Sequence, residues 1–385
     1  IERLMGKGGR LMAGYIISLN SEESLKECIE KGLYATLLSN PKNKRWLTPH
    51  EGTFVDYYGM KEGDNIYFFI KRKIYGIGVL VNHNGDCRYL NYPEADLPNV
   101  YDYDEIKDNM IMNREEDLTK RCFCIFKPYP KFFEHGVDMD EVLLSNPSKF
   151  RMLRAFWKLS FIKIDDEENK ALRDVILKVN EEHIFDDGHE IIHNADLQRT
   201  LLEKVNDNYR MVHTNILSSC QKDSKIGHEM AIEAALMDIL SNDRNNILGH
   251  WDYISHQVVA SPFKPVDYMD KMDIFGYRYI PGYDTISKYL VVEIKKDNAS
   301  KEVVDQVMKY VDWINQEYTY GNYGMIEAFV VAAGYDDDVL EYRNNIAVRN
   351  YMQGRRPIIN KIWTCLRLIK YRYENGEIKF EEVVE

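Results

Sequence analysis

The sequence predicts an α/β protein with two domains, a β-rich α+β domain followed by a mixed sheet flanked by helices. Three observations support this prediction. The chain has 385 residues, 45% of them hydrophobic, which is enough for two cores. Aromatic and β-branched runs dominate residues 13–180. In residues 226–385, helices with one apolar face alternate with strands, an order that favours a mixed sheet.

Composition limits the compartment and the partners. The chain contains no run of about 18 apolar residues and no charged, apolar leader, so we expect no membrane span, no secretory signal and a cytoplasmic location. The six cysteines are scattered without a C-x-x-C pair, and we expect reduced thiols. The net charge of -12 argues against a protein that coats nucleic acid indiscriminately, but a nuclease needs only a local basic patch.

The first domain opens with a strand at AGYIISL, and the helix that follows is expected to be capped by Asn20 or Ser21 and to end near Gly32. The run EGDNIYFFIKRKIYGIGVLV predicts a hairpin that turns at KRK. Strands at RCFCIFKPYP and LRAFWKLSFIKID and a helix at EENKALRDVILKVNEE complete the domain. Residues 181–225 are polar and rich in His, Asp and Asn, and they predict a helical connector.

The second domain begins with the predicted helix HEMAIEAALMDILS, which has one apolar face. The strands KMDIFGYRYI and YLVVEIKKDN follow on either side of a PGYD turn. A helix at KEVVDQVMKYVDWINQEY, a strand at MIEAFVVAA and a hairpin over YENGEIKF are predicted next. This order favours helices packed on a mixed sheet.

Two carboxylates are predicted to meet on the strands beside the PGYD turn. Asp273 lies ten residues before Tyr283, and Glu293 lies ten residues after it. If the two strands pair about this turn, the Cβ atoms of Asp273 and Glu293 lie about 4.5 to 5.5 Å apart. Two carboxylates at that separation repel each other by on the order of a few kcal/mol, so we expect a cation between them.

A hard divalent cation, Mg²⁺ or Mn²⁺, is the expected occupant because such ions prefer one or two carboxylates, water and phosphate oxygens. The ion would neutralise Asp273 and Glu293 and assist the hydrolysis of a phosphodiester. Lys295 shares a strand face with Glu293, so its ammonium would orient water or offset charge in the transition state. Lys296 points to the opposite face and is expected to be structural.

The helix after these strands adds two polar side chains. Gln306 and Tyr310 are four residues apart, so they lie on one helix face, beside the apolar stripe that packs on the sheet. Gln306 is therefore expected to point toward the sheet edge that carries Glu293. An E-x-K tripeptide alone is more often a surface salt bridge. The predicted position of Asp273 opposite Glu293, together with these two helix residues, is what favours a catalytic site.

This set of residues resembles the PD-(D/E)xK nuclease superfamily. Asp273, the E-I-K at residues 293–295 and the Q-x-x-x-Y at residues 306–310 resemble its RecB-like branch, with the spacing of the NucS mismatch endonucleases and a likeness to Shedu-type catalytic domains. The resemblance implies a restriction-endonuclease-like fold in which Asp273 and Glu293 ligate the metal and Lys295 is the catalytic lysine. It also implies that residues 306 and 310 position DNA or that lysine.

The same resemblance implies a further acid from the preceding helix. Glu229 and Glu233 are one turn apart on a shared face, and we favour Glu229. One departure from the family is that Met272, not proline, precedes Asp273. The resemblance covers residues 226–335, less than a third of the chain.

A rival metal motif lies in the connector. The run H-E-I-I-H at residues 189–193 matches H-E-x-x-H, in which two histidines one helical turn apart bind zinc and the glutamate is the base of a peptidase. Glu203 is a possible third ligand. The preceding FDDG and the polar surroundings favour an exposed helix start instead, with chance histidines at His189 and His193.

Residues 13–180 resemble the PUA-like superfamily, in particular its EVE-type and YTH-type domains, at GDNIYFFIKRKIYGIGVLV, FKPYPKFFEHGVDMDEV and SFIKIDDEENKALRDVIL. The resemblance implies a domain that binds modified bases or RNA by stacking a flipped base on aromatic rings. Candidates for such a pocket are Trp46, Tyr57, Tyr58 and Trp157, although core packing is the commoner role of such residues. Basic residues 71–73 in the hairpin turn either contact phosphate or are solvated.

The C-terminal run RRPIINKIWTCLRLIKYRY is the most basic stretch of the chain. Arg355, Arg356, Lys361 and Arg367 are the candidates for contacts with the DNA backbone. A strand with an ordinary solvated face would look similar in sequence.

Together these features predict a metal-dependent DNA endonuclease of restriction or antiphage defence, whose first domain selects the substrate, including modified or foreign DNA. Cleavage of both strands would favour a homo-oligomer, a dimer or tetramer, because each site hydrolyses one strand. The alternatives are an inactive nucleic-acid-binding or regulatory protein and, less favoured, the zinc peptidase.

Overall fold

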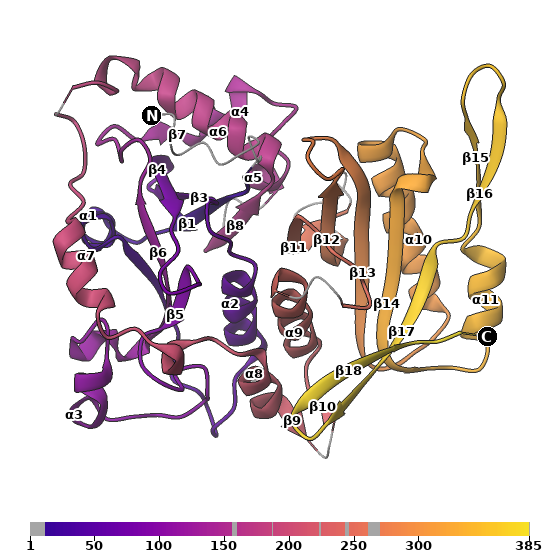
Figure 1. Cartoon of the computed structure of the whole chain (residues 1–385), viewed down its shortest axis with the longest axis horizontal. Helices are drawn as coiled ribbons and strands as arrows, with labels where there is room; N and C mark the ends of the chain where they lie inside the picture. The colour runs from indigo at the N-terminus through magenta and orange to yellow at the C-terminus, as the bar shows by residue number, and fades with distance from the viewer. Residues whose placement is uncertain are drawn as a thin grey trace. The chain divides into compact units, whose positions relative to one another are not determined.

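The computed structural model describes residues 12–155, 160–186, 188–222, 225–242, 246–260 and 270–384. These residues form two compact units, an N-terminal unit that ends at Val212 and a C-terminal unit that begins at His213 (Figure 1). The predicted connector at 181–225 is therefore divided between the two units. Among the described residues, no helix is long and apolar enough to cross a membrane.

The N-terminal unit is built on a mixed eight-stranded sheet. Its main path runs β2-β6-β4-β3-β1-β8, with β5 beside β6 and β7 beside β4. The strands are β1 (Gly14–Ser18), β2 (Leu33–Leu37), β3 (Asn65–Ile70), β4 (Lys73–Leu80), β5 (Arg88–Leu90), β6 (Lys120–Pro128), β7 (Val137–Asp138) and β8 (Phe161–Ile164). β1 pairs with β3 in parallel, and the other strand pairs are antiparallel.

Short helices surround this sheet. They are α1 (Glu22–Lys31), α2 (Thr48–Tyr58), α3 (Tyr103–Ile106), α4 (Met139–Ser145), α5 (Met152–Ala155), α6 (Asp166–Val179) and α7 (Ala195–Leu202). α1 follows its sequence signals, because the Ser21 side chain accepts a hydrogen bond from the Ser24 N–H and Gly32 ends the helix with a φ of 60°. The predicted hairpin is β3 and β4, and its turn residues Lys71 and Arg72 have φ angles of 46° and 70°.

Two predictions for this unit are wrong in part. Of the strand predicted over residues 153–165, β8 is the part that is a strand among the described residues, α5 occupies the start of the range, and residues 156–159 lie outside the described residues. The predicted connector includes α7, which packs on α1 and belongs to the N-terminal unit. The Gln198 side chain fixes this contact, since its Nε2 donates hydrogen bonds of 2.9 Å to the carbonyls of Gly32 and Phe126.

The aromatic residues considered for a base pocket are core residues. Trp46, Tyr57 and Tyr58 are almost fully buried. The Trp46 indole N–H donates a 2.7 Å hydrogen bond to the Asp96 carbonyl, and the Arg121 guanidinium lies over its ring. The prediction that these rings line a pocket is wrong because no face is left for a base; Trp157 lies outside the described residues.

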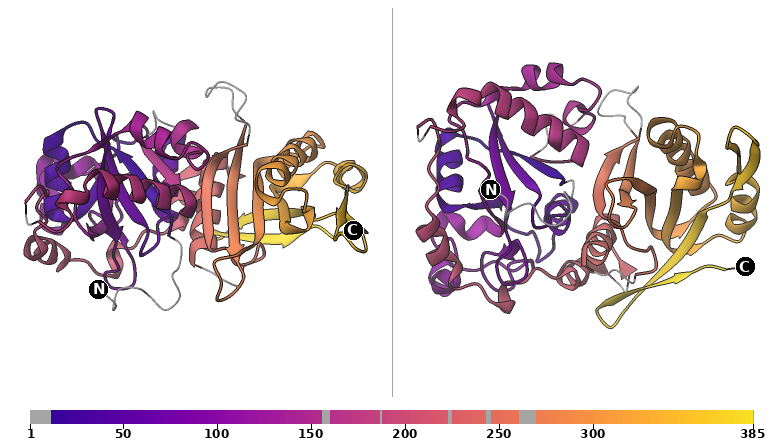
Figure 2. Two further views of the ribbon diagram at one scale, coloured as in Figure 1. Left: turned by 90° about the horizontal axis from the view of Figure 1, so that it is seen from above. Right: turned by 45° about the horizontal axis from the view of Figure 1, so that its top comes forward.

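The C-terminal unit contains the predicted mixed α/β sheet, in the order β11-β12-β13-β14-β17-β18 (Figure 2). Its strands are β11 (Tyr253–Val259), β12 (Lys271–Tyr279), β13 (Ile286–Ala299), β14 (Ile326–Tyr335), β17 (Leu366–Glu374) and β18 (Glu377–Glu382). β13, β14 and β17 run parallel to one another, and the remaining pairs are antiparallel. β11 was not predicted.

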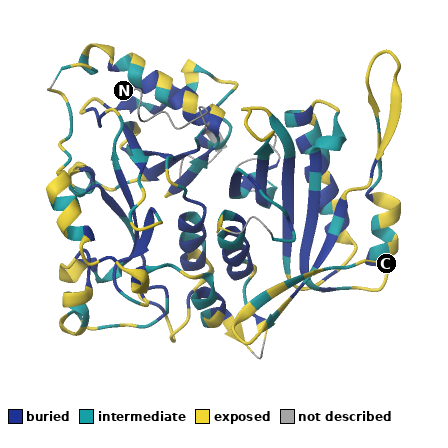
Figure 3. Ribbon diagram, viewed as in Figure 1, coloured by how far each residue is buried: buried dark blue, intermediate teal, exposed yellow. Residues whose placement is uncertain are grey.

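The helices of this unit are α8 (His213–Cys220), α9 (Glu229–Asn242), α10 (Glu302–Ile314) and α11 (Val339–Ile346). α9 packs against β11 to β13, and α10 packs against β13 and β14. Two small antiparallel pairs lie outside the sheet: β9 (Gln221–Lys222) with β10 (Lys225–Ile226), and β15 (Arg349–Gln353) with β16 (Ile359–Trp363). The β15–β16 hairpin extends away from the sheet of this unit and is largely exposed (Figures 1 and 3).

Candidate active site

The register of β12 and β13 brings the two predicted carboxylates together. Ile274 pairs with Val292, and the same register continues to Arg278 opposite Lys288. Continued by one residue, this register would place Asp273 opposite Glu293, and the 2.7 Å hydrogen bond from the Ile294 N–H to Asp273 Oδ2 agrees with it. The predicted symmetry about the turn is therefore correct along the strands, although a bulge between Arg278 and Tyr279 shifts the register nearer the turn.

The Asp273 carboxylate is held at both oxygens. Its Oδ2 accepts a 2.7 Å hydrogen bond from the Ile294 N–H, and its Oδ1 accepts a 3.3 Å bond from Gln257 Nε2. Burial, together with the negative charges of Glu293 and Glu233, raises the pKa of Asp273 to about 8. The site thus holds more negative charge than its own hydrogen bonds balance.

The Glu293 carboxylate is deeply enclosed. The residue is 2% exposed, and its Oε1 accepts a 2.6 Å hydrogen bond from Lys295 Nζ. Its Oε2 is buried and has no hydrogen-bond partner among the described residues. Burial raises the pKa of Glu293 even though the Lys295 charge opposes that rise. A buried carboxylate oxygen without a donor is a position that a cation would stabilise.

Lys295 and Lys296 differ as the strand alternation predicts. Lys295 shares the face of Glu293, and its side chain is 31% exposed, so the ammonium lies between the buried carboxylate and solvent. Burial disfavours the charged ammonium, but Glu293 outweighs this effect and raises the pKa of Lys295. Lys296 is exposed, and its ammonium lies 3.6 Å from Asp297.

α9 brings Glu233, more than Glu229, into this hydrogen-bonded group. Glu233 is buried, and its two oxygens contact His256 Nδ1 at 3.0 Å and Gln257 Nε2 at 3.3 Å. Gln257 therefore links Glu233 to Asp273. Glu229 is exposed and accepts a 3.3 Å hydrogen bond from the Lys296 N–H, outside that link. The negative charge of Glu229 nevertheless contributes to the raised pKa of Glu293 and of Lys295, so the preference between the two glutamates stays a prediction.

His256 and Gln257 were missed because β11 was missed. The sequence signal was WDYISHQVV, a strand-like run whose middle residues are polar. Gln257 has a φ of 52°, a backbone conformation that a propensity argument does not anticipate. It lies between His256, which pairs with Ile274, and Val258, which pairs with Met272, and so it reaches Asp273 from the neighbouring strand.

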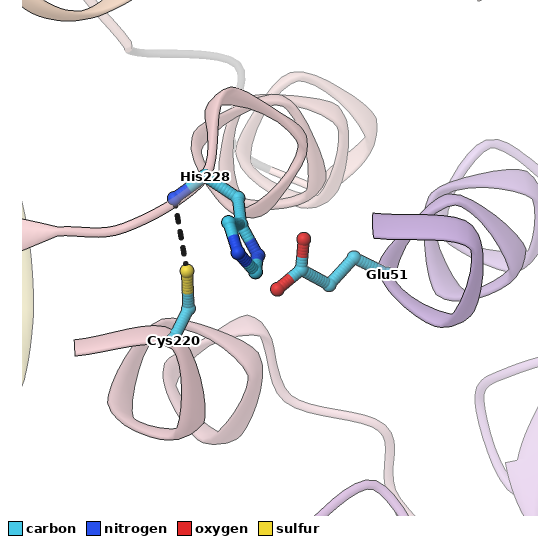
Figure 4. A group of neighbouring side chains, drawn as sticks. All are labelled: Glu51, Cys220 and His228. Carbon is cyan, nitrogen blue, oxygen red and sulfur yellow. Dashed lines mark hydrogen bonds between the residues drawn. The ribbon is translucent and has the colours of Figure 1, made fainter. Parts of the chain in front are cut away.

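The start of α9 is fixed by the end of α8. The His228 N–H donates a 3.1 Å hydrogen bond to Cys220 Sγ (Figure 4), and the Gly227 N–H donates a 3.1 Å bond to the Cys220 carbonyl. These bonds satisfy backbone donors immediately before the helix. His213 of α8 also contacts Asp238 of α9 at 2.7 Å. These contacts with α8 thus fix the position of α9, and with it Glu233, against the sheet.

α10 carries the predicted pair of polar residues on one face. Gln306 Nε2 donates a 3.0 Å hydrogen bond to Tyr310 Oη. Tyr310 is buried, and burial raises its pKa, with further contributions from the negative charges of Glu293 and Asp273. The phenol is thus within electrostatic range of both carboxylates. Its contact with DNA stays a prediction.

These residues fit a hard divalent cation. Asp273, Glu293 and Glu233 offer carboxylate oxygens, which Mg²⁺ and Mn²⁺ prefer, and one oxygen of Glu293 has no donor within the described part of the chain. His256 bonds to Glu233 and so orients that carboxylate, as a neighbour of a metal ligand commonly does.

The basic candidates fall into two groups. Arg355 and Arg356 lie between β15 and β16, Lys361 lies on β16, and all three are exposed. Arg367 is different, because its guanidinium bonds to the Glu382 carboxylate and lies over the Phe329 ring. That side chain stabilises the sheet edge and is not an open phosphate contact. In the other unit, Arg72 is likewise occupied by an ion pair of 2.6 Å with Asp140.

The H-E-x-x-H sequence does not form a zinc helix. Residues 188–194 are not helical, and Glu190 forms a β-bridge with Phe133. His193 Nε2 lies 3.3 Å from Gln198 Oε1, whereas the His189 ring packs against the His183 ring. The less favoured alternative, a peptidase centre on His189 and His193, is therefore wrong. The exposed helix start favoured for these residues is also wrong, because α7 begins only at Ala195.

No model of a known protein family matches the chain, and no curated protein matches it. A repair endonuclease from Pyrococcus abyssi is similar at 20% identity and a TM-score of 0.21, over 30% of this chain and 42% of that one. A complex of EndoMS with double-stranded DNA is similar at 18% identity and a TM-score of 0.21, over 30% of this chain and 40% of that one. A hypothetical protein from Leishmania major is similar at 13% identity and a TM-score of 0.27, over 45% of this chain and 98% of that one. The chain thus spans about two fifths of the two endonuclease chains.

We predict a pH-dependent stability that comes from Asp273. Native Asp273, with its pKa raised to about 8, keeps a proton that the unfolded chain has already released, so stability falls as pH rises through that range. In EDTA, the melting temperature of the wild type should fall between about pH 5 and about pH 8 and level off above that, and Asp273→Asn should flatten this slope. The exposed Asp297→Asn is the matched control and should keep the wild-type slope. Equal slopes in all three proteins would contradict the assignment.

Proposed function

We propose that this chain is a metal-dependent endonuclease that hydrolyses phosphodiester bonds in DNA. One observation carries the proposal: the buried Glu293 Oε2 has no donor among the described residues, and Lys295 Nζ lies 2.6 Å from the other oxygen of the same carboxylate. The negative charge of Glu293 also acts on Asp273, whose Oδ2 accepts a hydrogen bond from the N–H of the next residue, Ile294. Buried like charges beside a lysine are costly to fold, and such arrangements cluster at functional sites.

Asp273 and Glu293 would hold Mg²⁺ or Mn²⁺, with Glu233 as a third carboxylate of the same group. When bound, the ion would withdraw charge from the scissile phosphate and activate water for attack. His256 and Gln257 keep the Glu233 and Asp273 carboxylates oriented through their hydrogen bonds.

The remaining polar groups have separate roles in this proposal. Lys295 is held by Glu293 and exposed on its other side, so its ammonium can hydrogen-bond the attacking water or a phosphate oxygen as negative charge builds up. Gln306 and Tyr310 form a hydrogen-bonded pair, and their remaining polar capacity can position the DNA backbone or the lysine.

DNA is the proposed substrate because one projecting hairpin carries three exposed basic residues. Arg355, Arg356 and Lys361 lie on one projecting hairpin of a chain whose net charge is -12. The same hairpin exposes Ile358, Ile359 and Ile362. A basic ribbon with apolar sides suits contact with phosphates and bases. Restriction or antiphage defence, a homo-oligomeric state and a PUA-like first domain that selects modified or foreign DNA stay predictions.

The first test is cleavage of supercoiled plasmid with Mg²⁺, Mn²⁺ or EDTA. We expect metal-dependent nicking that Glu293→Ala and Asp273→Ala abolish. Lys295→Met should lower the rate by about 10²- to 10³-fold, because a charge that stabilises the transition state is lost. Lys296→Met, on the neighbouring residue, should leave the rate within about twofold of the wild type, since that side chain faces solvent.

The outcome of this test also decides between activity and binding alone. DNA binding without cleavage under all metal conditions would overturn the proposal in favour of an inactive nucleic-acid-binding protein. Equal activity of the Lys295 and Lys296 variants would overturn the role of Lys295.

A second prediction distinguishes the two glutamates of α9. Glu233→Gln should raise the Mg²⁺ concentration needed for half-maximal cleavage by about 10- to 100-fold, because it removes a buried charge that is linked to Asp273. Glu229→Gln should have a smaller effect, because Glu229 is exposed and contacts the backbone of Lys296. Metal titrations of the nicking rate check this order, and the reverse order would contradict it.

A third prediction concerns the β15–β16 hairpin. In a Glu293→Ala background, the double change Arg355→Ala and Arg356→Ala should weaken DNA binding at all sequences. It should also reduce the magnitude of the slope of log K for DNA binding against log salt concentration by about 0.9 for each lost phosphate contact. Arg367→Ala should leave the slope unchanged, because Glu382 already occupies that guanidinium. Fluorescence anisotropy at several salt concentrations measures both, and an unchanged slope in the double variant would contradict the prediction.

A further inference from the structure

The histidine pair of the N-terminal unit is not the one in the H-E-x-x-H sequence. His189 lies beside His183, with their ring centroids 4.2 Å apart. His183 Nδ1 lies 3.1 Å from Asp186 Oδ2. One ligand atom from each of these three residues lies within 4.8 Å of the others. Two imidazoles and a carboxylate therefore converge at one point, in a set that the proposed nuclease chemistry does not use.

The backbone on both sides fixes this cluster. His183 ends a short 3-10 helix (Glu181–His183) directly after α6, and its N–H donates a 2.9 Å hydrogen bond to the Asn180 carbonyl. On the other side, the His189 carbonyl accepts a 2.9 Å bond from the Glu134 N–H, next to the bridge between Phe133 and Glu190. His189 has a φ of 58°, which is uncommon for a residue other than glycine. The ring is thus held where it is despite an unfavourable backbone conformation.

Asp186 gives an independent sign that the cluster lacks a ligand. Its Oδ2 faces His183, and its Oδ1 has no hydrogen-bond partner among the residues that the structure describes, although the side chain as a whole is 42% exposed. The Asp186 main-chain carbonyl accepts a hydrogen bond from Lys131 Nζ, which ties the loop to the residues before Phe132. The carboxylate therefore keeps an oxygen that a cation beside the two imidazoles can take.

We propose that His183, Asp186 and His189 bind a divalent transition-metal ion of the Zn²⁺ class. Neutral imidazole and carboxylate are typical ligands of such ions, whereas Mg²⁺ and Ca²⁺ prefer oxygen alone. Ligand atoms in a tetrahedral zinc site lie about 3.3 Å apart, so a small contraction of the cluster suffices. Glu134 Oε2, 4.0 Å from His189 Nδ1, is positioned as a fourth ligand.

The ion would act as a clamp and not as a peptidase centre. It would join the segment after α6 to the strand-like segment at Glu134, two parts of the chain that are far apart in sequence. Glu190, the base of a peptidase motif, forms a backbone bridge with Phe133, and His193 contacts Gln198 instead of the cluster. This inference does not depend on the nuclease proposal.

The test measures Zn²⁺ bound by the full-length chain after removal of metal with chelator, addition of Zn²⁺ and gel filtration. His183→Ala and His189→Ala should each lose one equivalent relative to the wild type. His193→Ala, the matched control, should keep it. Because the nuclease carboxylates can also take Zn²⁺, Glu293→Gln is measured in parallel and should retain the equivalent that the His183 variant loses. Substitution of Co²⁺ gives a visible spectrum that should change in the same variants.

Two outcomes would overturn the proposal. One is equal Zn²⁺ content in the wild type and in the His183 and His189 variants. The other is loss of the equivalent in His193→Ala together with His189→Ala, which would restore the H-E-x-x-H pairing. The three histidines lie at or near the surface of their unit, so circular dichroism of the metal-free variants should match the wild type. With Zn²⁺ present, the wild type and His193→Ala should melt at a higher temperature than without it, and the His183 variant should not.

Discussion

The antiparallel pairing of β12 with β13 is the constraint on which the candidate active site depends. Because side chains alternate along a strand, a slip of one residue would turn Glu293 and Lys295 to the opposite face and separate Glu293 from Asp273. The register is held by the apolar residues between them, such as the buried pair Ile274 and Val292. The Ile294 N–H, bonded to Asp273, adds a polar bond that only this register allows.

The pairing has an electrostatic cost that the chain offsets only in part. Asp273 receives two hydrogen bonds, Glu293 receives a lysine on one oxygen, and Glu233 receives His256 and Gln257. The second oxygen of Glu293 receives no donor from the described residues. A protein selected for stability alone would place an apolar residue at such a position. The incomplete neutralisation is therefore better explained by a ligand than by folding.

Sequence reasoning succeeded where the signal was local and failed where tertiary packing decided. The position of the PGYD turn predicted the partner of Glu293, although the register there also depends on the bulge between Arg278 and Tyr279, which the sequence did not predict. Helical periodicity correctly predicted that Gln306 lies beside Tyr310. It could not decide between Glu233 and Glu229, since both glutamates share one face of α9. Burial against β11 makes that choice, and β11 itself was hidden by its polar centre. Aromatic density could not distinguish a core tryptophan such as Trp46 from one in a pocket.

The two clusters of acidic and imidazole groups differ in a way that bears on both proposals. The C-terminal cluster offers carboxylate oxygens with His256 behind one of them, whereas the N-terminal cluster offers two imidazoles and the Asp186 carboxylate directly. Oxygen-only sites suit Mg²⁺ and Mn²⁺, and mixed imidazole sites bind Zn²⁺ far more tightly than Mg²⁺. Ligand chemistry would therefore sort the metals between the two units. At a Mg²⁺ concentration that supports cleavage, Mg²⁺ would not compete with Zn²⁺ for the His183 and His189 cluster. Metal bound at one site would therefore not indicate whether the other site is occupied.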